Sequence, residues 1–244
     1  MDGAFWLTSS IILLLYLQRR FHEEIVTTLY LATLQLNLSL TIFSIIFFPG
    51  VLVHEVSHWL MARVLGVKTG GMSLIPERLP DGSLRMGYVE TGRTDILRDA
   101  LIGLAPLLAG SLLVAYAGFA RLRLHLLWGG LLSRDAGLFA AVLKAVYAQP
   151  DFWLWLYLIV AVSSMMLPSR SDRRAWRPVL LFLGLFFGAA LAIGAGPWMV
   201  GTAAPKINDW LRALSGVFWV SVLVHLVLLP PVIVLRGLFK NLRN

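Results

Sequence analysis

The chain has 244 residues, of which 58% are hydrophobic and only 14% are charged, whereas soluble globular domains carry about 25% charged residues. This composition is typical of an integral membrane protein and excludes an ordinary soluble fold. The formal net charge of +8 is more typical of cytoplasmic loops at a lipid surface than of nucleic-acid binding, so we expect no nucleic-acid partner. The chain has no cysteine, which excludes disulfides and thiol chemistry.

The distribution of apolar residues predicts an all-α polytopic membrane protein with about six transmembrane segments in a single domain, 1–244. Several apolar runs approach the roughly 20 residues that cross the hydrocarbon core of a bilayer. The runs lie at about 4–18, 25–66, 100–119, 152–168, 178–200 and 214–235. Two arginines end the first run in place of a small-residue cleavage site, which predicts a retained anchor.

The second apolar run is too long for one straight span. It covers 42 residues, Ile25 to Gly66, and would measure about 63 Å as a helix, twice the hydrocarbon thickness of a bilayer. Pro49-Gly50 predicts a kink, because proline removes a backbone donor and clashes with the preceding turn. We therefore expect a long bent helix at about 35–66, preceded at 21–34 by a connector or an interfacial helix.

The segment from about 67 to 94 differs from its surroundings, since it is rich in glycine, proline and charge. Apolar residues alternate with polar ones at Leu84 and Met86, a pattern typical of a strand. Asp81-Gly82 is a hairpin turn signal. We expect a small β-hairpin here, which either binds an extended substrate by strand addition or simply closes one face of the membrane domain.

A metal-binding motif, His54-Glu55-Val56-Ser57-His58, lies inside the expected bent helix. Residues i and i+4 share one face of a helix, so His54 and His58 can bind one ion. Zinc lowers the pKa of a bound water to about 7, and Glu55 is placed to accept its proton as the general base of peptide hydrolysis. Imidazoles and a carboxylate are costly in lipid, which favours a functional role.

A zinc site of this kind needs a third protein ligand, which must be His, Asp or Glu in a chain without cysteine. Asp172 is the main candidate, because it follows shortly after the membrane helix expected at 152–168. Its alternative role is a solvated charge beside two arginines. Glu77 and Glu90 in the expected hairpin are the reserve candidates.

These features resemble the site-2 protease family of intramembrane zinc metalloproteases. Pro49-Gly50 leads into the metal motif, and Leu167-Pro168 leads to Asp172 much as in the family's Asn-x-x-Pro…Leu-Asp-Gly element. The resemblance implies that Asp172 is the third zinc ligand and that the substrate is the transmembrane segment of a membrane protein.

The resemblance is partial and marks the chain as a divergent member. Ser163 or Ser164 stands where the family usually has asparagine, and Arg173 stands where it has glycine. The matches cover about 35–66, 100–112 and 163–172, while the first and last segments have no recognisable counterpart.

Two basic clusters indicate the orientation in the membrane. One follows the expected helix at 152–168, the other lies at the C-terminus, and two apolar spans separate them. The positive-inside rule then predicts that both clusters, and the C-terminus, are cytoplasmic. We expect a multi-pass protein of the cell membrane.

The sequence therefore predicts a zinc-dependent metalloendopeptidase that cuts membrane proteins within or beside transmembrane segments. His54, His58 and Asp172 bind Zn²⁺, and Glu55 is the general base. Two alternatives remain open: a membrane zinc protease of another family, with a glutamate ligand and soluble or misfolded substrates, and a non-catalytic metal-binding membrane scaffold.

Overall fold

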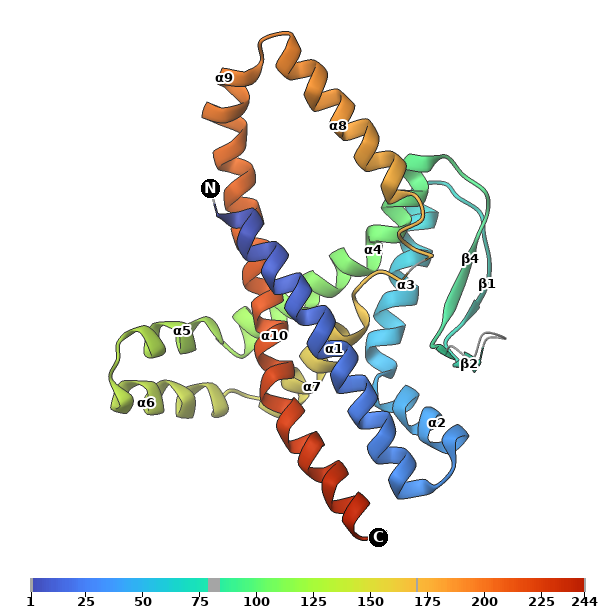
Figure 1. Ribbon diagram of the computed structural model, residues 1–244, viewed down its shortest axis with the longest axis vertical. Coiled ribbons are helices and arrows are strands. Elements are labelled where there is room, and N and C mark those ends of the chain that lie inside the picture. The colour runs from blue at the N-terminus through green and yellow to red at the C-terminus, as the bar shows by residue number, and fades with distance from the viewer. Residues whose placement is uncertain (1, 79–83, 170, 244) are drawn as a thin grey trace.

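The computed structural model describes residues 2–78, 84–169 and 171–243, and the chain is predominantly helical (Figure 1). This fits the predicted all-α membrane protein. The helices are α1 (Gly3–Thr33), α2 (Leu36–Ile46), α3 (Phe48–Val64), α4 (Ile96–Ala115), α5 (His125–Leu132), α6 (Ala136–Tyr147), α7 (Phe152–Met165), α8 (Trp176–Ala192), α9 (Gly196–Trp198) and α10 (Ala204–Asn241), with π-helical turns η1 (Tyr116–Arg121) and η2 (Met199–Ala203).

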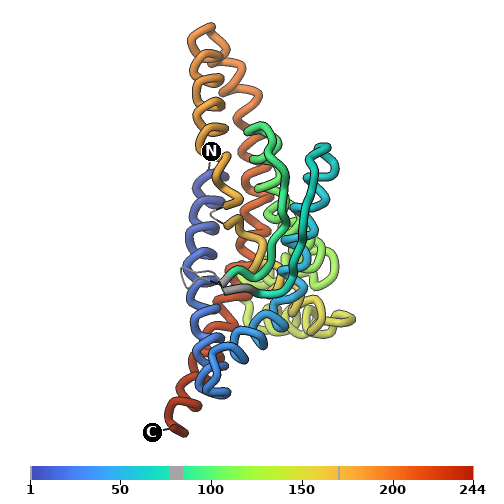
Figure 2. The backbone as a smooth tube through the Cα atoms, turned by 90° about the vertical axis from the view of Figure 1, so that its right-hand side faces the viewer, coloured from blue at the N-terminus to red at the C-terminus, as the bar shows by residue number. Residues whose placement is uncertain are grey.

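The two longest helices, α1 and α10, lie side by side and run in the same direction (Figures 1 and 2). The prediction of a connector or interfacial helix at 21–34 is wrong, because these residues continue α1 to Thr33. The carboxylate of Glu24 is buried, yet it lies 2.8 Å from Arg20 on α1 and 3.0 Å from Arg236 on α10. The paired charges therefore do not interrupt the helix.

The hydrophobic core lies where α1, α4, α7 and α10 meet. It contains the fully buried side chains of Leu14, Val114, Ile159 and Phe218, one from each helix. Helix α3 packs against the other side of α4 and α7, and this places the metal motif at the edge of the core.

The bent helix predicted at about 35–66 is present as the pair α2 and α3, whose axes differ by 69°. The break falls at Phe47, just before the predicted Pro49-Gly50. Pro49 lies in the first turn of α3, where its missing N–H would have no intrahelical acceptor in any case. Pro49 is therefore compatible with the first turn of the metal helix, which begins at Phe48.

Among the described residues, the stretches 96–121 and 196–241 are long and apolar enough to cross a membrane, and the bent pairs α2–α3 and α6–α7 would each add one span. The count is two to four, so the predicted six segments are not confirmed. Helix α8 is not among these candidate spans; it has 17 residues, all at least partly exposed. Helix α1 is not among them either, because its apolar run ends at its arginines. Exposed apolar faces of this size are typical of contact with lipid.

A narrow antiparallel hairpin stands beside α3 (Figure 1). Strand β1 (Thr69–Ser73) pairs with β4 (Tyr88–Thr91), and β2 (Glu77–Arg78) pairs with β3 (Leu84–Arg85). The structure thus contains the hairpin predicted within 67–94. The predicted turn, Asp81-Gly82, lies outside the described residues.

Candidate metal centre

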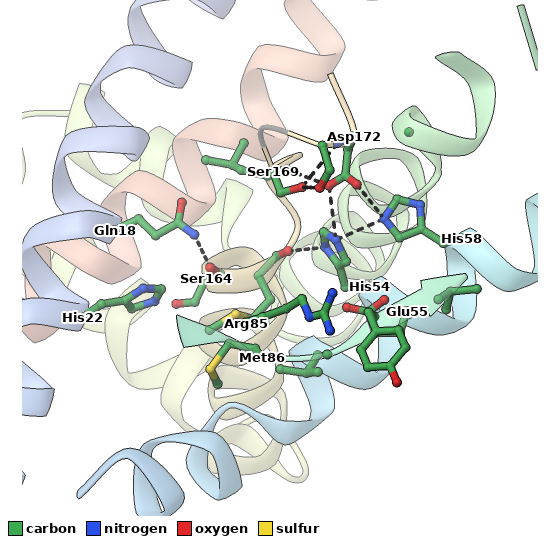
Figure 3. Close-up of a pocket in the computed structure, with 18 of the residues that line it drawn as sticks. Gln18, His22, His54, Glu55, His58, Arg85, Met86, Ser164, Ser169 and Asp172 are labelled. Carbon is green, nitrogen blue, oxygen red and sulfur yellow. Dashed lines mark hydrogen bonds and ion pairs between the residues drawn. The ribbon is translucent and has the colours of Figure 1, made fainter. Parts of the chain in front are cut away.

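The two histidines of the motif face each other across one turn of α3 (Figure 3). Their Nε2 atoms are 3.2 Å apart. The other ring nitrogen of each contacts a backbone carbonyl from a different helix: Nδ1 of His54 is 2.6 Å from the oxygen of Met165 in α7, and Nδ1 of His58 is 2.8 Å from the oxygen of Ile102 in α4. Both rings are therefore fixed in orientation by α7 and α4.

These carbonyl contacts also determine which nitrogen carries the proton. A carbonyl oxygen only accepts hydrogen bonds, so Nδ1 of each neutral ring must be the donor and Nε2 must carry a lone pair. The lone pairs of His54 and His58 then point toward the same small space. Such a pair repels unless a proton or a metal cation lies between the nitrogens. Metal-ligating histidines commonly have this arrangement, with the second N–H donated to a carbonyl.

Asp172 completes the group from the loop between α7 and α8. Its Oδ2 is 3.6 Å from Nε2 of His54, and its Oδ1 is 3.4 Å from Nε2 of His58. The backbone N–H of Ser169 donates a 2.7 Å hydrogen bond to Oδ2, and the N–H of Asp172 donates to the Ser169 hydroxyl. This reciprocal pair holds the carboxylate toward the histidines.

The three groups lie close enough together to share one metal ion. Zinc bonds of about 2.0–2.2 Å at tetrahedral angles separate neighbouring ligand atoms by about 3.3–3.6 Å. The histidine nitrogens are 3.2 Å apart, the two oxygens of Asp172 lie 3.4 and 3.6 Å from them, and one ligand atom from each residue falls within 4.8 Å of the other two. The structure therefore brings His54, His58 and Asp172 together as a possible metal-binding triad, and the mixture of two imidazoles and one carboxylate suits zinc and related ions.

The carboxyl group of Asp172 is ionised near neutral pH. Burial alone would raise its pKa, but hydrogen bonds from His54 and His58, when these rings are protonated at Nε2, and from Ser169 outweigh burial and hold the pKa well below its usual range. A carboxylate must be deprotonated to bind a metal. Asp172 therefore meets the electrostatic requirement for a ligand.

Glu55 lies on the neighbouring side of α3, and its residue is only 6% exposed. Its carboxylate points toward the hairpin, where the guanidinium of Arg85, at the end of β3, lies next to it (Figure 3). The backbone at Gly87 is so close that an added Cβ would lie 2.9 Å from Cγ of Glu55. The hairpin thus covers the carboxylate predicted to act as the base.

All four predicted site residues line one cavity of about 1230 Å³. The cavity extends from the metal-binding triad past the hairpin residue Met86 to α1, where Gln18 and His22 line it (Figure 3). It is large enough for several residues of an extended peptide, and it combines an apolar wall with the polar groups of the triad. These properties are typical of a ligand or substrate site.

A buried polar network supports the end of α7 that fixes His54. The carbonyl of Ser164 accepts a hydrogen bond from Nε2 of Gln18 on α1. The Ser164 hydroxyl is 2.9 Å from Nε2 of His225 on α10, and Nδ1 of His225 is 2.8 Å from the carbonyl oxygen of Ser221. Helices α1 and α10 therefore hold α7 in place one residue before the carbonyl that orients His54.

Of the two reserve ligands, Glu90 does not join the triad. Glu90 is exposed on β4, where it accepts a hydrogen bond from the N–H of Gly71, and the side chain of Glu77 lies outside the described residues. The carbonyl groups of Ile102 and Met165 could not be identified from the sequence, because every residue type has a backbone carbonyl. Nor could Gly87, whose proximity to the motif depends on how the hairpin folds back.

No protein-family model, curated protein or solved structure matches this chain. Two imidazoles with fixed tautomers, an ionised carboxylate and a second buried carboxylate share one cavity, and this arrangement is suited to metal-assisted hydrolysis.

Proposed function

We propose that the protein is a zinc-dependent intramembrane endopeptidase, a divergent relative of the site-2 protease family. The observation that carries this proposal is the convergence of Asp172 on His54 and His58, which brings one ligand atom from each residue within 4.8 Å of the others. Asp172 comes from the segment that resembles the family's ligand element. Glu55 lines the same cavity, as a general base must.

Zinc held by His54, His58 and Asp172 would activate water for attack on a peptide carbonyl and polarise that carbonyl. Glu55 accepts a proton from the attacking water. As the carbon–nitrogen bond breaks, Glu55 returns the proton to the leaving amine nitrogen. The C–O bond forms as the C–N bond is lost, and no covalent link to the protein is made.

The proposed substrate is the transmembrane segment of a membrane protein in the lipid bilayer. An intact helix hides its carbonyls in hydrogen bonds, so the segment must unwind locally before it is cut. The hairpin lies beside Glu55 and offers strand edges to which an unwound segment could add. We further propose a multi-pass location in the cell membrane, with the C-terminus in the cytoplasm.

Two other functions compete with this one. A zinc protease of another membrane family would use a glutamate as its third ligand, and the exposure of Glu90 on β4 argues against that residue. A metal-binding scaffold without activity would need no base, whereas Glu55 is buried and faces the cavity. An unneeded carboxylate in an apolar helix would be costly.

The substitution Glu55→Gln tests the proposed activity. Glutamine has nearly the same shape but cannot accept the proton, so we expect zinc to bind as in wild type while cleavage falls by about 100- to 10,000-fold. New protein N-termini would be quantified in the membrane fraction of cells producing either form. Glu90→Gln, which changes an exposed carboxylate, is the matched control. Equal cleavage by wild type and Glu55→Gln would refute the mechanism.

A further inference from the structure

The ligand Asp172 lies on a loop, whereas His54 and His58 lie on a helix. A loop ligand needs external support, because its backbone has no regular hydrogen-bond ladder to fix it. The loop that carries Asp172, residues 166–175 (the ligand loop), begins with Met166 packed against Gly110 of α4. Nearer to Asp172 it contacts α4 at two further points, which involve one face of that helix. The first point is Gly103, where an added Cβ would overlap the backbone carbonyl of Asp172.

The second point is an ion pair between Asp99 in the first turn of α4 and Arg174. It is bidentate: Nε of Arg174 donates to Oδ2 of Asp99 at 2.7 Å, and a terminal nitrogen donates to Oδ1 at 2.6 Å. The Asp99 side chain is 18% exposed and that of Arg174 is 63% exposed. A surface pair of this kind contributes little to stability, but its two parallel hydrogen bonds define an orientation.

Helix α4 therefore positions two of the three ligands, His58 and Asp172. Asp99, Ile102 and Gly103 lie at positions i, i+3 and i+4 of α4 and share a face. The carbonyl of Ile102 orients His58, while Gly103 and Asp99 hold the loop that carries Asp172. A shift of that loop against α4 would therefore change the separation between His58 and Asp172.

Arg174 is also a potential competitor for the metal. It lies two residues from Asp172, lines the same cavity, and interacts electrostatically with that carboxylate. A free guanidinium could form its own bidentate pair with Asp172 and occupy the oxygens that a metal requires. In the structure, Asp99 engages Nε and one terminal nitrogen of Arg174 and so directs the guanidinium toward α4.

We propose that Asp99 and Arg174 are positioning residues for the metal ligand Asp172. Their bidentate pair fixes the ligand loop on α4 and keeps the Arg174 guanidinium away from the Asp172 carboxylate. This inference rests on the proposed metal site and adds to it a support for the third ligand.

The test is Co²⁺ and Zn²⁺ binding to the full-length protein in detergent, followed by the visible absorption of bound Co²⁺ and by competition with a chelator. Outer partners of metal ligands are usually worth about 10- to 100-fold in affinity, so we expect Asp99→Asn to weaken binding by about that factor. Adding Arg174→Gln to Asp99→Asn removes the competing cation, and the double variant should recover part of the loss.

Two further variants separate positioning from folding. Arg174→Lys leaves α4 unchanged and keeps the charge but loses the bidentate geometry, so it too should weaken binding and alter the Co²⁺ spectrum. Arg98→Ala removes an ion pair of α4 with Asp95, 3.3 Å long, that does not involve the ligand loop. It should bind metal as wild type does. Unfolding of the metal-free variants measures their stability independently of metal binding.

The outcomes distinguish this inference from the proposed function. His54→Ala identifies metal bound at the triad. If wild type binds Co²⁺ in a His54-dependent way and Asp99→Asn and Arg174→Lys bind it equally well, the positioning role is wrong and the metal site stands. If the double variant binds no better than Asp99→Asn, competition by Arg174 is wrong. If wild type shows no His54-dependent binding, both proposals fail.

Discussion

The substitution Asp172→Asn removes the charge of the proposed third ligand and nearly preserves the shape of its side chain. Asparagine retains the size of the side chain and an oxygen that can accept the hydrogen bond from Ser169, which is 2.7 Å long in the structure. It loses the negative charge that faces His54 and His58. Exchanging one acceptor for another changes stability by about 1 kcal/mol or less, so the metal-free protein should remain folded.

The effect on metal affinity follows from the ligand count. The triad supplies three ligand atoms within 4.8 Å of one another, and the variant leaves two imidazoles and a neutral amide. Loss of an outer partner costs about 10- to 100-fold in affinity, and loss of a direct, charged ligand must exceed this. We therefore expect the dissociation constant for zinc to rise by at least about 100-fold, equivalent to about 2.8 kcal/mol.

Competition against a chromophoric chelator would measure these affinities, with Glu77→Gln and Glu90→Gln as controls that also test the reserve ligands. Both controls should bind zinc as wild type does. If Asp172→Asn binds zinc as tightly as wild type while a glutamate variant loses it, the third ligand is that glutamate. The assignment of Asp172, and with it the likeness to the site-2 protease family, would then be wrong.

Two more substitutions probe the cover of the site and the support of α7. Gly87→Ala places a Cβ 2.9 Å from Cγ of Glu55. The resulting displacement of the hairpin should slow cleavage by about 10- to 100-fold and leave the zinc content unchanged. The control is Gly92→Ala, whose added Cβ would lie 3.4 Å from the nearest atom and should not slow cleavage. His225→Leu leaves the buried Ser164 hydroxyl without its partner and should lower the free energy of unfolding, followed by tryptophan fluorescence, by about 1–3 kcal/mol. The double variant with Ser164→Ala should cost less than the sum of the single changes, and additive costs would contradict the network.

Features that depend on neighbouring residues could be predicted from the sequence. The four-residue spacing of His54 and His58 places them on one face of any α-helix, wherever that helix lies. Pro49 marked the break within the apolar run to within two residues, because the effect of proline on a helix is local. The hairpin within 67–94 followed from a local change of composition and alternation.

Prediction was weaker where long-range pairing changes the meaning of a segment. The charges at 21–34 suggested an interruption, but Glu24 is paired with Arg236, 212 residues away, and α1 continues through them. The six apolar runs suggested six spans. Hydropathy alone measures neither helix length nor bending, and the described residues contain two to four candidate spans.

Composition and the motif thus determined the membrane class, the pair of histidines and the neighbouring carboxylate, because each is a property of a few adjacent residues. Only the tertiary structure decided what completes the site. The carbonyl that orients His54 lies 111 residues away along the chain, and Asp172 approaches the histidines because Gly50 and Gly103 let α7 and the ligand loop pack directly against α3 and α4. A metal centre needs three ligands at fixed separations, and such separations depend on how whole helices pack.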